Sequence, residues 1–217
     1  MGAPAAAARR EKSRRFSLAA PSPGFVRWAK ALIFVLCLGP LARLVAGGFL
    51  DRLGANPVEL ITRSTGTWTL TFVMITLSVT PLRRLSGWRW LARLRRMFGL
   101  FAFFYASLHF TTYIWLDQFF DLAAIAKDIV KRPFITLGFS AFVMLIPLAA
   151  TSTDAMARRL GGKNWTALHR LVYVLAICGV VHYWWLVKRD ITRPALYALV
   201  LAVLLGFRAA ASLKRRE

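Results

Sequence analysis

The chain has 217 residues, 58% of them hydrophobic, and a mean hydropathy of +0.53. This composition resembles that of a membrane protein far more than that of one soluble domain. The formal net charge of +21 would suit nucleic acid, but a nucleic-acid binder carries its basic residues on a folded polar face. Here they lie between apolar segments. We therefore expect a protein of the lipid bilayer and no nucleic-acid partner.

The amino-terminal segment, residues 1–24, is rich in Ala, Pro, Arg and Ser. Such a composition cannot bury a core, so we predict a disordered, basic cytoplasmic tail. A twin-arginine run at 13–16 loosely resembles an export signal. Prolines and a glycine interrupt the apolar stretch that such a signal needs, so we do not interpret the run as one.

Six later segments approach the roughly 20 apolar residues that cross a bilayer core. They are 28–46, 66–82, 97–116, 134–151, 166–187 and 194–212. The connections between them are short. We therefore predict an all-α fold, in which residues 25–213 form one bundle of six transmembrane helices and 214–217 form a short cytoplasmic tail.

The basic residues predict the orientation of this bundle. With the amino terminus in the cytoplasm, 20 Lys and Arg lie on the cytoplasmic side and 8 on the opposite side, with Arg43 and Arg170 counted inside spans. The positive-inside rule then places both termini in the cytoplasm. Tryptophans near the ends of the spans agree, because they resemble an aromatic belt.

The two cysteines, Cys37 in the first span and Cys178 in the fifth, are isolated, and no Cys-x-x-Cys-His motif occurs. This pattern excludes covalent attachment of a c-type haem. It also excludes a cysteine cluster for iron–sulfur or structural zinc. We interpret both cysteines as packing residues.

All three histidines, His109, His169 and His182, lie within predicted spans. A titratable ring in hydrocarbon is costly, so such residues indicate a functional site that faces the bundle interior. If the third and fifth spans run outward, His109 lies roughly 10 Å and His182 roughly 8 Å from the outer end of its helix. The two are therefore expected at the same depth.

Two neutral imidazoles at one depth on two helices can ligate a haem iron from opposite faces. We therefore predict a b-type haem for electron transfer, held by His109 and His182. The alternative is a pair of packing histidines hydrogen-bonded across the bundle. Asp117 and Asp121 follow His109, but one histidine with loosely spaced carboxylates is a weak signal for zinc.

His169 lies only about 5 Å from the inner end of the fifth span. It precedes His182 by 13 residues, so on a straight helix the two rings would point roughly 140° apart. No fourth histidine exists, and Arg95 and Arg96 stand where a partner on the third span would be expected. Three interpretations stay open: His169 ligates an inner haem with an unusual partner, contributes to a quinone or flavin site, or lies at the interface beside Arg170.

Other polar residues also allow two interpretations. The polar residues of 63–67 either support a haem propionate or a docked partner, or cap the second span. The arginines of 83–96 either hold a flavin phosphate or reflect topology and anionic lipid. Tyr105 and Tyr113 lie one turn on either side of His109, and they either pack on a porphyrin or make ordinary helix contacts.

Several strings of residues between 28 and 212 together resemble one family. They are NPVE at 56–59, TRSTGTW at 62–68, RRMFGL at 95–100, FFYASLHF at 103–110, RPFITLG at 132–138, PLAATS at 147–152, WTALHRLVY at 165–173 and HYWW at 182–185. They resemble the haem-binding membrane subunit of the protein-methionine-sulfoxide reductase system, the MsrQ or YedZ family. That family belongs to the wider group of ferric-reductase-like membrane domains.

The resemblance implies an electron-transfer subunit of a bacterial inner membrane, with no substrate-reducing site of its own. Related NADPH oxidases carry a cytoplasmic FAD and NADPH domain after the last span, and this chain ends too soon for one. Electrons are therefore expected from the quinone pool or a cytoplasmic flavin reductase, with FMN or a bound quinone as further candidate cofactors. They would leave to a periplasmic molybdenum-dependent methionine sulfoxide reductase that repairs oxidised proteins.

The resemblance also implies that His109 and His182 are the haem ligands and that His169 is a third candidate. The alternative function is a stand-alone ferric or quinone reductase with the same haem. A secondary transporter would show internal repeats and intramembrane charges near the midplane. Pro40 with Arg43 is the only hint of such a feature, and no repeat is visible.

Overall fold

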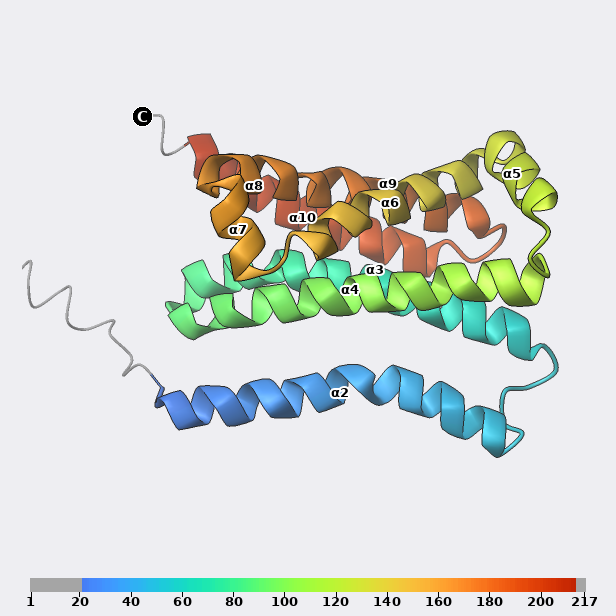
Figure 1. Cartoon of the computed structure of the whole chain (residues 1–217), viewed down its shortest axis with the longest axis horizontal. Helices are drawn as coiled ribbons and strands as arrows, with labels where there is room; N and C mark the ends of the chain where they lie inside the picture. The colour runs from blue at the N-terminus through green and yellow to red at the C-terminus, as the bar shows by residue number, and fades with distance from the viewer. Residues whose placement is uncertain (1–20, 214–217) are drawn as a thin grey trace, which may run out of the picture.

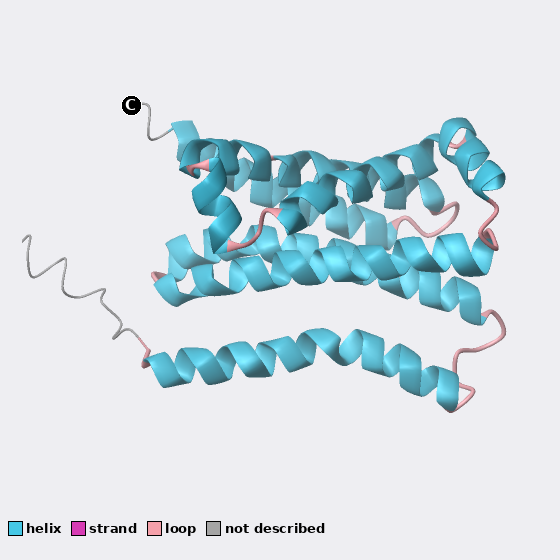
Figure 2. Cartoon of the chain, viewed as in Figure 1, coloured by secondary structure: helices cyan, strands magenta, loops and turns pink. Residues whose placement is uncertain are grey.

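The computed structural model describes residues 21–213, and all its regular elements there are helices (Figure 1, Figure 2). They are α2 (Pro23–Phe49), α3 (Pro57–Ser86), η1 (Arg89–Leu91), α4 (Ala92–Thr112), the π-helix η2 (Tyr113–Asp117), α5 (Leu122–Lys131), α6 (Pro133–Ala150), α7 (Asp154–Leu160), α8 (Gly162–His169), α9 (Leu171–Leu186) and α10 (Thr192–Leu213). The all-α prediction is confirmed for this range. The predicted tails, 1–24 and 214–217, lie outside it except for residues 21–24, of which 23–24 belong to α2.

The long helices run alternately in opposite directions along one bundle (Figure 1). α2 begins and α10 ends at the same end, which we call the terminal end, and the short helices α7 and α8 lie there too. α5 lies at the opposite end, which we call the α5 end. This arrangement places the residues of α3, α4, α6 and α9 side by side in the bundle interior.

Local signals explain where the long helices begin. Prolines occupy the first position of α2, α3 and α6, where the missing N–H costs nothing. The side chains of Ser22 and Asn56 accept hydrogen bonds from the amides of Phe25 and Glu59, which caps α2 and α3. α3 therefore begins at Pro57, so the interpretation of residues 63–67 as its cap is wrong.

Five helical stretches are long and apolar enough to cross a membrane, one fewer than predicted. They are Pro23–Phe49, Arg89–Asp117, Pro133–Ala150, Gly162–Leu186 and Thr192–Leu213. The missing one is α3, which has 30 residues but whose apolar run at 66–82 is interrupted by threonines. The threonines lower its hydropathy, although its length would suffice.

The polarity of α3 is satisfied inside the helix. The hydroxyls of Thr69, Thr71 and Thr76 each donate to the carbonyl one turn earlier, at 2.7–2.9 Å. α3 contacts α2, α4, α9 and α10 and supplies much of the buried core. It is therefore an interior helix whose hydroxyls need no water.

The predicted fifth span, 166–187, is not one continuous helix. α8 ends at His169, Arg170 forms a turn, and α9 begins at Leu171. The amide of Arg170 bonds to the carbonyl of Ala167, and its own carbonyl accepts from Tyr173, so both contacts span three residues instead of four. The angle expected between His169 and His182 on a straight helix therefore does not apply.

Within residues 21–213, one side chain makes the hydrogen bonds that attach α2 to the bundle. The hydroxyl of Tyr105 on α4, which is fully buried, donates to the carbonyl of Cys37 at 2.9 Å and accepts from the amide of Leu41 at 3.2 Å. These two groups flank Pro40, whose ring interrupts the helical hydrogen-bond ladder. The hydroxyl thus satisfies backbone groups at the bend of α2. Tyr105 therefore makes helix contacts through its hydroxyl, and packing of the ring on a porphyrin stays a prediction.

Candidate functional site

His109 on α4 and His182 on α9 meet in the interior of the bundle. Their ring centres are 6.4 Å apart, and the ring planes are inclined at 73°. The structure therefore brings together the two residues that were expected at one depth. Both rings are partly buried, in segments that are otherwise apolar.

Each of these rings is oriented by a backbone carbonyl of a neighbouring helix. Nδ1 of His109 lies 2.9 Å from the carbonyl oxygen of Thr62 on α3, and Nδ1 of His182 lies 2.6 Å from that of Phe134 on α6. A carbonyl can only accept, so Nδ1 carries the proton in each neutral ring. The lone pair of each Nε2 is left available.

A glycine lies against each ring. A Cβ atom on Gly66 would come within 2.9 Å of Cε1 of His109, and a Cβ on Gly138 within 2.9 Å of Cε1 of His182. Gly66 follows Thr62 by one helical turn, and Gly138 follows Phe134 by one turn. In each case the carbonyl and the glycine therefore face the same histidine ring. Any larger residue would displace the imidazole. Nothing in the sequence alone indicates a role for either glycine.

The distance between the two rings matches that of a metal ion bound by an imidazole on each side. Metal–imidazole bonds of about 2 Å, with roughly 1 Å from each nitrogen to its ring centre, place ring centres about 6 Å apart, close to the 6.4 Å here. In residues 21–213 no three His, Cys, Asp or Glu form a group that would hold a bare metal ion. The pair therefore fits a haem iron, for which two protein ligands suffice.

The alternative of two packing histidines hydrogen-bonded across the bundle holds in one respect: each ring donates to a carbonyl of a neighbouring helix. The two rings are not hydrogen-bonded to each other. Both Nδ1 protons are used by the carbonyls of Thr62 and Phe134. The two Nε2 atoms are then both acceptors, and two acceptors cannot share a hydrogen bond. The hydroxyl of Tyr113 donates to Asp128 at 3.4 Å, so this residue makes a helix contact, and its packing on a porphyrin stays a prediction.

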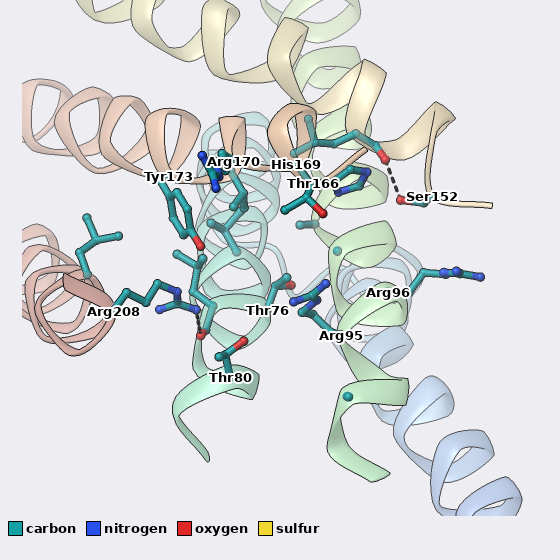
Figure 3. A pocket seen from close by; sticks show the side chains of 18 of the residues that line it. Thr76, Thr80, Arg95, Arg96, Ser152, Thr166, His169, Arg170, Tyr173 and Arg208 are labelled. Carbon is teal, nitrogen blue, oxygen red and sulfur yellow. Dashed lines mark hydrogen bonds between the residues drawn. The ribbon is translucent and has the colours of Figure 1, made fainter. Parts of the chain in front are cut away.

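A second feature is a large cavity at the terminal end of the bundle, with a volume of about 1010 Å³ (Figure 3). Small and apolar residues of α3, α4, α6 and α10 form much of its wall. His169 and five arginines also line it, namely Arg84, Arg95, Arg96, Arg170 and Arg208. Its lining in the described part of the chain contains no carboxylate. The cavity is therefore cationic.

His169 is held at the wall of this cavity by two contacts. Its ring stacks on that of Trp165, with centres 4.0 Å apart, and its Nε2 lies 3.2 Å from the hydroxyl of Thr151. That hydroxyl already donates its proton to the carbonyl of Pro147 at 2.6 Å, so it accepts from Nε2. Nδ1 of His169 is then the unprotonated nitrogen.

The arginines of the cavity differ in what they bind. Arg96 pairs with Asp154 of α7, and this contact lowers the pKa of the Asp154 carboxyl. Arg208 of α10 donates to the carbonyl of Leu77 on α3, which has no helical partner because Pro81 lacks an N–H. Arg95, by contrast, has no acidic partner among residues 21–213. Figure 3 shows it on the same cavity as His169.

The comparisons with known proteins agree on one group. Residues 65–180 match the family described as ferric reductase like transmembrane component. The protein-methionine-sulfoxide reductase heme-binding subunit MsrQ of Herminiimonas arsenicoxydans is 59% identical over 187 residues, which cover 85% of this chain and 86% of the relative. The protein of the same name from Azospira oryzae is 58% identical over 189 residues, which cover 87% and 81%.

The glycine contacts generate a prediction. Gly66→Ala or Gly138→Ala should displace the adjoining imidazole, because overpacking by a methyl group costs about 1–3 kcal/mol. That cost corresponds to a roughly 5- to 150-fold loss of haem affinity, to be measured by haem titration of the purified protein. Gly206→Ala on α10 is the matched control, since a Cβ there meets nothing within 4 Å. Equal haem affinity in all three variants would contradict the assigned role.

Proposed function

The chain belongs to the MsrQ family of heme-binding subunits, and on that premise we propose that it carries electrons across a bacterial inner membrane to a methionine sulfoxide reductase. A b-type haem held by His109 and His182 is the proposed carrier. The observation that supports this most directly is the pair of imidazoles, each with Nδ1 fixed by a carbonyl and Nε2 free.

A bound haem would supply a one-electron redox centre. Ligation by both His109 and His182 would leave no open position on the iron, which suits electron transfer instead of oxygen chemistry. The carbonyls of Thr62 and Phe134 accept protons from the ligands, which fixes the tautomers and raises ligand basicity. Gly66 and Gly138 allow both rings to approach their helices closely.

The cationic cavity is the proposed site of electron entry. Its arginines suit an anionic group, because guanidinium forms strong charge-assisted hydrogen bonds with phosphate and carboxylate. FMN carries a phosphate and is therefore favoured over an uncharged quinone head group as its occupant. A second haem with two propionates is the other anionic group that this lining suits, with His169 as its ligand. The donor would be a cytoplasmic flavin reductase or the quinone pool.

The proposed orientation places the terminal end in the cytoplasm. The arginines of 83–96 lie at this end, which the positive-inside rule assigns to the cytoplasm. We include α3 as a sixth span, because its 30 residues run along the same bundle as the five apolar ones (Figure 1). Both termini are then cytoplasmic. The haem site lies nearer the periplasm, where a molybdenum-dependent reductase would dock.

The ligand assignment predicts a spectrum. Purified protein should show the sharp reduced bands of low-spin, non-covalent haem b. His109→Ala or His182→Ala should each abolish the bands of the haem held by this pair, because one imidazole cannot hold the iron in the same state. His169→Ala is the control and should leave at least part of the spectrum, with a loss of about half the haem if the cavity holds a second one. Normal bands in either of the first two variants would disprove the assignment.

The orientation predicts the behaviour of reporter fusions. Fusions after Lys163 and at the carboxyl terminus should report the cytoplasm, and fusions near Asp121 and Asp190 should report the periplasm. All four sites follow α3 in the chain, so their alternation tests whether α6, α9 and α10 cross the membrane. With a cytoplasmic amino terminus, an α3 that did not cross would invert the reported sides at all four sites. A periplasmic carboxyl terminus would reverse the proposed direction of electron flow.

The proposed partner predicts a kinetic result. Protein in liposomes, reduced by quinol or by a flavin reductase, should reoxidise rapidly once a periplasmic methionine sulfoxide reductase and a sulfoxide substrate are added together. Stopped-flow absorbance of the haem bands measures the rate. The control omits the reductase and should show slow reoxidation. A rate equal to the control would remove the partner and favour a stand-alone ferric or quinone reductase.

A further inference from the structure

The connection between α4 and α6 carries an apolar surface that the bundle does not cover. Leu122 and Val130 of α5 are 75% and 82% exposed, and Phe119 and Phe120 just before it are 80% and 61% exposed. Ala126 lies between Leu122 and Val130 on the same face, because residues four apart stack along a helix. This stripe and the two phenylalanines form what we call the α5 apolar face.

The opposite side of α5 is different. Ile125 is buried against the bundle, and Asp128 is 16% exposed at its side chain. Lys127 and Lys131 are exposed on the side away from the apolar stripe. The apolar surface of α5 therefore extends beyond the part that the bundle buries. Lys127 and Lys131 add two positive charges beside the exposed apolar stripe. This pattern is typical of a helix that lies in the plane of a membrane interface.

The backbone before α5 is strained in a way that exposes the two rings. Phe119 and Phe120 have φ angles of +48° and +62°, a left-handed conformation that glycine normally occupies at the end of a helix. The amide of Phe120 bonds to the carbonyl of Ile114 at 2.9 Å, which closes the π-helical end of α4. Strain at bulky residues persists only where the surroundings compensate it. The described chain does not bury these rings.

We propose that the α5 apolar face is inserted into the membrane–water interface at the α5 end, with Lys127 and Lys131 directed to anionic lipid headgroups. Two observations favour lipid over a protein partner. α5 joins two membrane-length helical stretches, Arg89–Asp117 and Pro133–Ala150, so it lies where the bilayer surface must be. It is also turned across the long helices (Figure 1), as an interfacial helix requires.

Asp128 connects α5 to the end of the helix that carries His109. Its carboxylate accepts from the hydroxyl of Tyr113 and the amide of Gln118, at 3.4 and 3.3 Å, and pairs with Arg132 at 3.3 Å. Tyr113 follows His109 by one helical turn. A helix held in the interface therefore fixes the height of His109 relative to the membrane surface, whichever group the histidine binds.

The test uses nitroxide labels on single cysteines, in full-length protein in which Cys37 and Cys178 are replaced by alanine. Labels at Leu122→Cys and Val130→Cys report the apolar face, and a label at Lys127→Cys is the matched control on the polar edge. In liposomes containing anionic lipid, the first two should collide several-fold more with oxygen, which dissolves in lipid, than with a water-soluble nickel complex. The control should show the reverse.

A second measurement avoids substitutions altogether. Unaltered protein in liposomes that contain a diazirine-bearing phospholipid should acquire photolabel in the peptides that span 119–130, as read by mass spectrometry. High nickel accessibility at both Leu122→Cys and Val130→Cys, or an absence of photolabel in 119–130, would overturn the proposal. Protection of these sites only after a methionine sulfoxide reductase is added would also overturn it and assign the face to a protein partner.

Discussion

The bundle depends on one contact that occurs twice: an imidazole Nδ1–H donated to a carbonyl on a neighbouring helix, beside a glycine one turn later. α4 is joined in this way to α3, and α9 to α6. Among the described helices, these two pairs also form the most extensive contacts. The core of the fold is therefore two close pairs that face each other, and the rings of His109 and His182 lie 6.4 Å apart where the pairs meet.

This arrangement explains how much of the site the sequence could predict. The depth of His109 and His182 follows from helical rise alone, so their proximity could be predicted from their positions in the spans. The glycines could not be assigned a role in the same way, because a small residue becomes informative only when the partner helix is known. Gly66 and Gly138 lie on α3 and α6, and nothing in their own segments indicates which histidine faces them.

The structure differs from the sequence-based prediction in α3 and in the fifth span, because local hydrogen bonds determine the conformation there. The hydropathy of α3 understates its burial, since Thr69 and Thr71 return their hydroxyl protons to their own helix and so add little polar surface. The fifth span looked continuous, but Arg170 forms a turn there that separates the fixed ring of His169 from α9. In both places, the mean hydropathy of a window of about 20 residues does not report the individual hydrogen bonds that determine the structure.

The contact between Tyr105 and the bend of α2 has a consequence for biosynthesis. α2 is the first helix of the described chain to leave the ribosome, yet within residues 21–213 the side-chain hydrogen bonds that join it to other helices all come from Tyr105, which is translated much later. Until α4 enters the membrane, the carbonyl of Cys37 and the amide of Leu41 lack this partner beside Pro40. α2 must therefore remain undocked, in lipid or in the insertion machinery, until α4, the helix that carries His109, is inserted. Only then can α2 complete its packing against the bundle.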